Sequence, residues 1–250
     1  MGAAIAIALT TALSLFPPGE GPPADTDAIG LDQKVSLSSG DYGPLVEYLQ
    51  VRLTNAGFRP GEADGTYGRA TYQAVLAFEK HHGLPRDGVF ERRDWDLLNE
   101  TPSVRLRSES DRIEIDLGKQ VLYLVKDDAV QAVVGVSSGS GGTFINYSGR
   151  PVTAQTPEGQ YSFFMERNYN HTSYLGTMYK PFYFYGGYAI HGSPSVPGYP
   201  ASHGCVRVTN DDMDFLRTEL ELGMTIYLHG QRTDNPSGIT AGPIAGPRAA

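Results

Sequence analysis

The only cysteine in the chain, Cys205, lies among histidine and glycine residues. It belongs to the run Ser202-His203-Gly204-Cys205-Val206-Arg207, and another His-Gly pair, His191-Gly192, begins fourteen positions before the cysteine. The thiolate is the nucleophilic form of cysteine, and a nearby imidazole is the usual group that generates it. These residues predict a nucleophilic cysteine with His191 as its general base.

The spacing within residues 202–208 places the polar side chains on one side of an extended segment, because side chains alternate along a strand. That side would carry His203, Cys205 and Arg207. A guanidinium beside a thiol favours the thiolate. We therefore expect Arg207 to promote ionisation of Cys205.

Glycine residues beside the two reactive side chains leave space for a substrate. Gly204 has no side chain where a carbonyl must approach, and its amide and that of Cys205 could both face a developing oxyanion. Because no Asp or Glu lies near either motif, a backbone carbonyl is the expected group that orients His191.

Two other kinds of site contain these residue types. A zinc site normally shows paired Cys-x-x-Cys or His-x-x-x-His spacing, which the segment around Cys205 lacks. We therefore expect no metal and no cofactor. A buried, inert thiol would explain Cys205 alone, but not two His-Gly pairs together with Arg207.

The residues around these motifs predict a β-rich domain, residues 108–230, that must hold the reactive side chains. Its apolar residues recur with a period of two, which is typical of strands. The expected strands are 112–117, 120–125, 129–136, 161–165, 182–185, 188–190, 206–208 and 225–228. One helix is expected, capped by Thr209 or Asn210, with an apolar face of Met213, Leu216 and Leu220. So many short strands favour a sandwich-like pair of sheets.

A small helical domain, residues 36–102, is expected before the strands. Pro44 suits the first position of a helix and Gly57 its end, Gly83 ends a second helix, and Trp95 marks a short third helix. The whole chain is thus an α+β multidomain protein, with a three-helix bundle before the β-rich domain.

An internal repeat organises the helical domain. Asp64-Gly65-Thr66-Tyr67-Gly68-Arg69 returns as Asp87-Gly88-Val89-Phe90-Glu91-Arg92. Each Asp-Gly pair predicts a turn that leads into a helix, and each aromatic residue is expected to pack at the helix entry. We interpret these residues as structural.

Residues 40–99 resemble the peptidoglycan-binding domain found beside many bacterial wall enzymes. The resemblance rests on Leu49-Gln50, Leu53, Gly57-Phe58, Asp64-Gly65, Tyr67-Gly68, Thr71, Ala74-Val75, Phe78, Gly83-Leu84 and Asp87-Gly88. The resemblance implies that peptidoglycan stem peptides and glycan are the partners of this chain.

Residues 110–229 resemble the catalytic domain of the L,D-transpeptidases, whose hallmark is His-Gly followed by Ser/Thr-His-Gly-Cys. The segment Thr156-Pro157-Glu158-Gly159-Gln160-Tyr161 is also similar to the family pattern. The interval Gly192–Ala201 is shorter than in many members. The resemblance implies a set of catalytic residues, Cys205, His191, Gly192 and His203, and a set of substrate-binding residues, Ser202, Gly204 and Arg207.

The implied reaction is attack of Cys205 on a peptidoglycan tetrapeptide stem, followed by transfer of the thioester to an amine of another stem, which makes a 3-3 cross-link. Two alternatives remain open. Water could accept the acyl group, giving an L,D-carboxypeptidase, or the chain could be a non-catalytic wall-binding protein.

Composition and the chain ends indicate where this chemistry takes place. The formal net charge of -8, from 20 Lys and Arg against 28 Asp and Glu, argues against a polybasic nucleic-acid binder. Residues 1–33 combine an apolar run with a Pro/Gly linker, which predicts an export signal or, as second choice, a retained membrane anchor. Residues 231–250 are expected to be a disordered tail rich in Gly, Pro and Ala. We expect a secreted or cell-envelope monomer.

Overall fold

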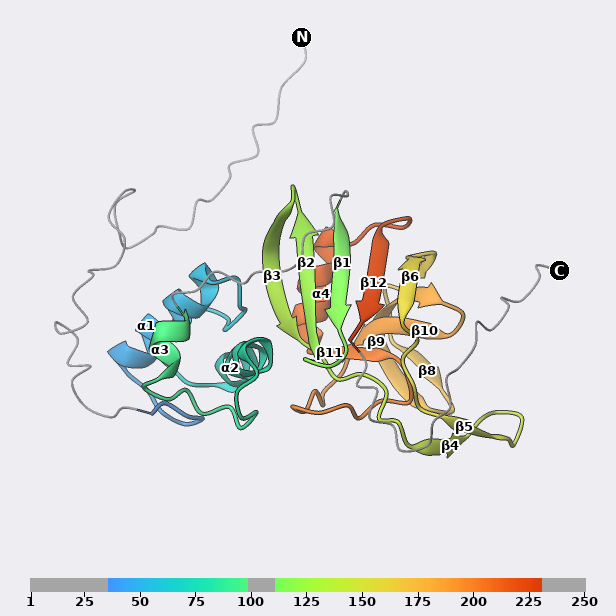
Figure 1. The fold of residues 1–250 in the computed structure, drawn as a ribbon, viewed down its shortest axis with the longest axis horizontal. Coiled ribbons are helices and arrows are strands. Elements are labelled where there is room, and N and C mark those ends of the chain that lie inside the picture. Colours follow the sequence, from blue (N-terminus) through green and yellow to red (C-terminus); the bar gives the residue numbers. More distant parts are fainter. Residues whose placement is uncertain (1–35, 99–110, 231–250) are drawn as a thin grey trace, which may run out of the picture. The chain divides into compact units, whose positions relative to one another are not determined.

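In the part of the chain that the structure describes, three helices precede a β-rich region that contains one further helix (Figure 1). The structure is a computed structural model and describes residues 36–98 and 111–230. The helices are α1 (Pro44–Asn55), α2 (Arg69–His82), α3 (Asp94–Leu98) and α4 (Asn210–Glu219). The predicted α+β class is confirmed. The export segment and the C-terminal tail expected at the two ends lie outside the described residues.

Within residues 111–230, twelve strands follow α3, and α4 lies before the last of them. They are β1 (Arg112–Asp116), β2 (Val121–Lys126), β3 (Ala129–Gly135), β4 (Thr143–Ile145), β5 (Pro151–Thr153), β6 (Gly159–Ser162), β7 (Met165–Glu166), β8 (His171–Ser173), β9 (Gly176–Tyr185), β10 (Tyr188–Gly192), β11 (Val206–Val208) and β12 (Thr225–His229). One sheet has the order β3-β2-β1-β12-β6, and a second has the order β11-β10-β9-β7, with β8 also paired to β9. A separate hairpin joins β4 to β5.

The strands of the first sheet lie side by side in Figure 1. Its central strand β1 pairs antiparallel with β2 and parallel with β12. Polar and apolar residues alternate along β1, and the polar Arg112 and Glu114 are buried as well as Ile113 and Ile115. The Arg112 Nε donates to Glu114 Oε1 over 2.7 Å, so the polar side of the strand is neutralised within the structure.

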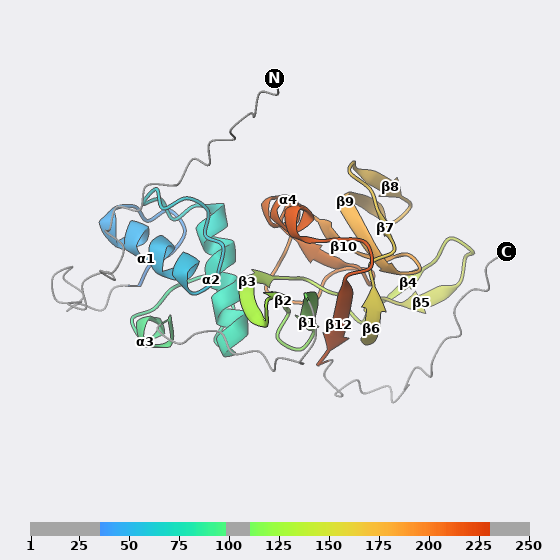
Figure 2. The same ribbon diagram turned by 90° about the horizontal axis from the view of Figure 1, so that it is seen from above.

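The main core lies between the two sheets. Its members are Ile113, Ile115, Leu122, Leu124, Val134, Ile226 and Leu228 from the first sheet, and Phe182, Phe184, Ile190, Val206 and Val208 from the second. Helix α4 packs along β9 and β10, as Figure 2 shows, and adds Met213 and Leu216. Thr209 caps this helix by accepting the amide hydrogen of Asp212 over 3.0 Å. Of the two predicted caps, Thr209 and Asn210, it is therefore Thr209 that forms the cap. This arrangement fits the expected sandwich-like pair of sheets.

The repeat in the helical bundle forms two equivalent turns. Asp64 Oδ1 accepts from the amide of Thr66 over 2.8 Å, and Asp87 Oδ1 accepts from the amide of Val89 over 3.0 Å. The aromatic residue of each copy is buried, and the Tyr67 hydroxyl donates to the Gly88 carbonyl over 2.8 Å. The first copy is thereby bonded to the second, which supports the structural interpretation.

One expected strand is divided. Residues 161–165 were predicted as a single strand, but β6 ends at Ser162 and pairs with β12, whereas β7 begins at Met165 and pairs with β9. Phe163, buried between them, lies where the chain passes from one sheet to the other.

In the described residues, 36–98 and 111–230, no helix has the length and apolar character required to cross a membrane.

Candidate active site

Cys205 lies immediately before β11, and His191 lies on the neighbouring strand β10. These strands are parallel, with Ile190 opposite Val206 and His191 opposite Arg207. Because side chains alternate, Cys205 shares a face with His191 and Arg207, while the two valines of β11 enter the core. A diagonal pair on adjacent strands is within reach of long side chains. The ladder therefore places the thiol and the imidazole over one cavity.

His191 is held by its own chain neighbour. Its Nδ1 lies 2.9 Å from the carbonyl oxygen of Gly192, and only 6% of the residue is exposed. Because a carbonyl only accepts hydrogen bonds, Nδ1 carries the proton and Nε2 keeps its lone pair. The pKa of His191 is lowered to about 4, chiefly by burial and also by the Arg207 cation, against the Gly192 carbonyl, which raises it. The imidazole is therefore neutral at neutral pH and can accept a proton.

The Cys205 thiol is the protonated form at rest. Its Sγ lies 4.0 Å from Met178 Sδ and 3.7 Å from the Gly187 carbonyl oxygen. Burial raises the pKa of Cys205, and this effect outweighs the Ala189 amide and the Arg207 cation, which both lower it. Arg207 thus favours the thiolate, as expected, but its effect is smaller than that of burial. A neutral thiol and a neutral imidazole therefore line the same cavity.

The residues just before Cys205 form a tight turn instead of the expected extended segment. The Ser202 hydroxyl donates to the Cys205 carbonyl over 2.5 Å and accepts from the Gly204 amide over 3.0 Å. Only Val206–Val208 is a strand. The Gly204 amide is therefore occupied and does not serve as the predicted oxyanion donor, and the Ser202 hydroxyl is used to close the turn.

Gly204 is required by the backbone and by packing. Its φ of +136° is unfavourable for residues with a side chain, and a Cβ there would lie 2.7 Å from Tyr188 Cε1. The Thr156 hydroxyl anchors the same residue by donating to its carbonyl over 2.7 Å. The space expected for an approaching carbonyl is filled by the Tyr188 ring.

His203 and Arg207 flank the thiol from different elements. The His203 ring packs edge-on against Phe144 of β4, with ring centroids 4.9 Å apart and planes at 73°. The Arg207 backbone exchanges two hydrogen bonds of 3.0 Å with Ser137. Both His203 and Arg207 line the cavity that contains Cys205, so the structure brings all the predicted reactive side chains to one place.

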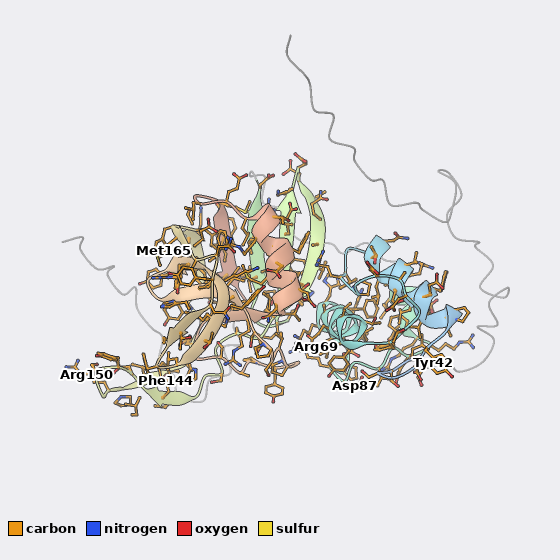
Figure 3. All side chains as sticks on the ribbon, turned by 180° about the vertical axis from the view of Figure 1, so that it is seen from behind. Tyr42, Arg69, Asp87, Phe144, Arg150 and Met165 are labelled. Atoms are coloured by element: carbon orange, nitrogen blue, oxygen red, sulfur yellow. The ribbon has the colours of Figure 1, made fainter. Side chains whose placement is uncertain are left out.

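That cavity has a volume of about 610 Å³. Much of its wall comes from residues that the sequence motifs did not identify: Phe144, labelled in Figure 3 on the β4–β5 hairpin, and His171, Tyr174, Met178, Tyr183 and Tyr188 around the β8–β9 and β9–β10 turns. The density of tyrosine between residues 169 and 188 is the available signal: it predicts mainly a structural role and, as the weaker alternative, aromatic lining of a substrate cleft, which is where Tyr174, Tyr183 and Tyr188 lie. Within residues 36–98 and 111–230, no group of three His, Cys, Asp or Glu side chains is placed to hold a metal ion.

Comparison with known proteins agrees with this geometry. The YkuD family, described as the L,D-transpeptidase catalytic domain, matches residues 110–228, and a putative peptidoglycan binding domain matches residues 42–98. The crystal structure of an L,D-transpeptidase from Xylanimonas cellulosilytica is 44% identical, with a TM-score of 0.74, and the match covers 77% of this chain and 97% of that one. The chain belongs to the L,D-transpeptidase family.

Short parts of this L,D-transpeptidase also match curated proteins. N-acetylmuramoyl-L-alanine amidase CwlM of Mycobacterium tuberculosis is 40% identical over 48 residues, which is 19% of this chain and 12% of that protein. The spore cortex-lytic enzyme of Bacillus cereus is 42% identical over 53 residues, or 21% and 20% of the two chains. The L,D-transpeptidase chain thus spans at most about a fifth of these two relatives.

Proposed function

We propose that this protein cross-links peptidoglycan through a thioester on Cys205. The observation that carries the proposal is the parallel pairing of β10 with β11, which directs His191 and Cys205 into one cavity beside Arg207. A nucleophile, a base with a fixed tautomer and a nearby cation are the groups that acyl transfer requires.

In the first step, the Cys205 sulfur attacks the carbonyl that joins the third residue of a tetrapeptide stem to its terminal D-amino acid. Because thiol and imidazole are both neutral at rest, the thiol proton passes to His191 Nε2 as the sulfur–carbon bond forms. The carbon–nitrogen bond then breaks, and His191 returns the proton to the leaving amine. Arg207 stabilises the negative charge on sulfur before that bond is complete.

In the second step, the amine of a neighbouring stem attacks the thioester. His191 takes a proton from this amine, and the thiol is restored when the carbon–sulfur bond breaks. The product is an amide between the third residues of two stems. Gly192 contributes by holding the His191 ring through both steps, since its carbonyl fixes Nδ1 as the protonated nitrogen.

The N-terminal bundle, which matches a peptidoglycan binding domain, is proposed to hold the same polymer. Both activities require the protein to act outside the cytoplasmic membrane, and we propose that it is a secreted or envelope-associated monomer. The predicted export segment and the alternative of a membrane anchor concern residues 1–33, and therefore stay predictions.

Incubation of the purified protein with a disaccharide tetrapeptide, followed by mass spectrometry, tests the proposal. A cross-linked dimer that has lost one terminal D-amino acid is expected, together with an acyl-enzyme on Cys205. A tripeptide product without dimer would instead identify the L,D-carboxypeptidase. Cys205→Ala should give neither product, and turnover by that variant would exclude the thioester mechanism. Absence of any product from the intact protein would favour a non-catalytic wall-binding role.

A further inference from the structure

The segment that connects His191 to Ser202 is bonded to the helical bundle by three cationic side chains. Arg69, labelled in Figure 3 at the start of α2, donates through Nη2 to the Pro194 carbonyl over 2.5 Å. Lys80 near the end of α2 donates to the Pro197 carbonyl over 3.3 Å, and Arg86 just beyond α2 donates to the Gly198 carbonyl over 2.9 Å.

The composition of this segment explains why it depends on such donors. Residues 193–201 include three prolines, which lack an amide hydrogen and prevent a regular strand ladder. The carbonyl groups of the segment remain acceptors, and side chains of the bundle donate to three of them. The segment is also close to the bundle, because a Cβ on Gly198 would lie 3.1 Å from Arg86 Cβ. The bundle thus supplies donors that the segment cannot supply for itself.

Lys80 is the central member of the three, because it is fully buried and joins two parts of the β-rich domain. Besides Pro197, its Nζ donates to the Val136 carbonyl over 2.9 Å. The next residue, Ser137, exchanges backbone hydrogen bonds with Arg207 and donates its hydroxyl to the Tyr199 carbonyl over 2.8 Å. One amine therefore connects the segment with the strand end that holds Arg207.

Deprotonation of Lys80 does not remove its hydrogen bonds to the Val136 and Pro197 carbonyls. The pKa of Lys80 is lowered to about 7, chiefly by burial and also by the Arg86 cation, against Glu79, which raises it. A neutral amine still has two hydrogens and two carbonyl acceptors. The link between α2 and the segment therefore exists on both sides of neutral pH.

The same segment forms part of the active-site wall, since Ser193, Pro194 and Ser195 line the cavity around Cys205. We propose that the bundle is a positioning element for catalysis, in which Lys80, with Arg69 and Arg86, fixes the wall of the cavity against which the stem peptides bind. Lys80 is a positioning residue that acts through residues 193–201 and has no contact with the reacting atoms. This inference rests on the proposed function, because it assigns a role within that reaction.

The test compares Lys80→Met and Arg69→Met with the control Arg52→Met in the full chain. Because Arg69 is exposed, Arg69→Met should leave the bundle folded even if Lys80→Met disrupts it. Arg52 lies on α1 and bonds Tyr48. Amide hydrogen exchange of residues 193–201 is expected to become about tenfold faster in the two test variants, as for loss of a hydrogen bond to a charged donor. The control should exchange like the parent protein.

Turnover and thiol reactivity separate positioning from general damage. In the two test variants, kcat/KM for the tetrapeptide should fall by about ten- to a hundredfold, as expected when a substrate-positioning wall is displaced. Alkylation of Cys205 by iodoacetamide should keep its rate, whereas partial unfolding would change both. Normal exchange, or faster exchange with undiminished turnover, in both variants would overturn the inference. If the parent protein has no turnover, the proposed function fails, while the exchange result still reports whether the bundle fixes the segment.

Discussion

His191 donates its Nδ1 hydrogen to the carbonyl of Gly192, the residue that follows it, over 2.9 Å. The proposed base is thus oriented by the backbone of its own strand and does not need a carboxylate from elsewhere in the chain. Nε2 remains the basic nitrogen of a ring that lines the same cavity as Cys205.

Replacing His191 by Ala should lower the rate of acyl-enzyme formation by about 10²- to 10⁴-fold, the range typical of a lost general base. The measurement is the single-turnover rate of tetrapeptide acylation followed by intact mass. His203→Ala is the matched comparison, because it removes an imidazole that packs on Phe144 from the same cavity. We expect the smaller loss for His203→Ala, and equal losses would contradict the assignment of His191 as the base.

The ionisation of Cys205 should depend on pH in a specific way. Because burial raises the pKa of the thiol and lowers that of His191, the free protein should hold no thiolate–imidazolium pair. Alkylation by iodoacetamide should therefore be slow at pH 5 to 7 and rise only above the ordinary thiol range, about 8.5. Arg207→Met should move this rise to still higher pH. A reactive plateau between pH 5 and 7 would show that the ion pair exists at rest.

Thr156 should prove necessary for the shape of the Cys205 turn. Its hydroxyl accepts from the Gly139 amide over 2.9 Å and donates to the Gly204 carbonyl over 2.7 Å. Thr156→Val keeps the volume but removes both bonds, so unfolding free energy should fall by about 1–3 kcal/mol. Urea denaturation measures this loss, and turnover should decrease with it. Thr156→Ser retains the hydroxyl and should stay close to the parent in both measurements; a Thr156→Val variant of normal stability would refute the role.

Glu79 should make the stability of the protein depend on pH. Its buried carboxylate accepts from the Gly88 amide over 2.9 and 3.1 Å, and burial raises its pKa to about 8 from 4.5. The folded state then binds a proton more tightly than the unfolded state, so this contribution is complete below pH 4.5 and is lost as pH rises to about 8.

Glu79→Gln should abolish that dependence, because an amide keeps the acceptor for Gly88 and does not ionise. Urea unfolding at pH 5, 7 and 9 measures the unfolding free energy of both proteins. Relative to the variant, the parent should lose on the order of 2 kcal/mol of unfolding free energy between pH 5 and pH 9. Glu62→Gln, at an exposed position, provides the control. Parallel stability curves for Glu79→Gln and the parent would exclude the buried carboxylate as the cause.

The local parts of the fold could be predicted from the sequence. The proline at the start of α1, the left-handed Gly83 after α2 and the Thr209 cap of α4 act within one turn of the chain, so their residue types reveal them. The two Asp-Gly turns are recognisable for the same reason. The reactive side chains were also evident, because their motifs are contiguous.

Features that depend on distant segments were not accessible in this way. The burial of both faces of β1 depends on pairing with β12, more than a hundred residues away in sequence. The high pKa of Cys205 depends on how deeply the fold encloses it, and the loss of the Gly204 amide depends on a turn closed by Ser202. The cavity wall at Tyr174 and Tyr183 comes from the turn between β8 and β9 and from β9 itself, and the sequence gives no indication that either faces Cys205.

The parallel ladder between β10 and β11 has a consequence for divergence within the family. Because backbone pairing sets the distance between His191 and Cys205, the length of the connection from Gly192 to Ala201 is not what sets it. Insertions and deletions in that connection can accumulate without separating the reactive pair. In this chain the connection is also tied to α2, so a new connection requires matching changes in Lys80 and Arg86. Selection on acceptor preference would then leave paired substitutions, one in the helical bundle and one in the catalytic domain. Exchanging only one of these two domains between relatives would disrupt the hydrogen bonds between the connection and α2.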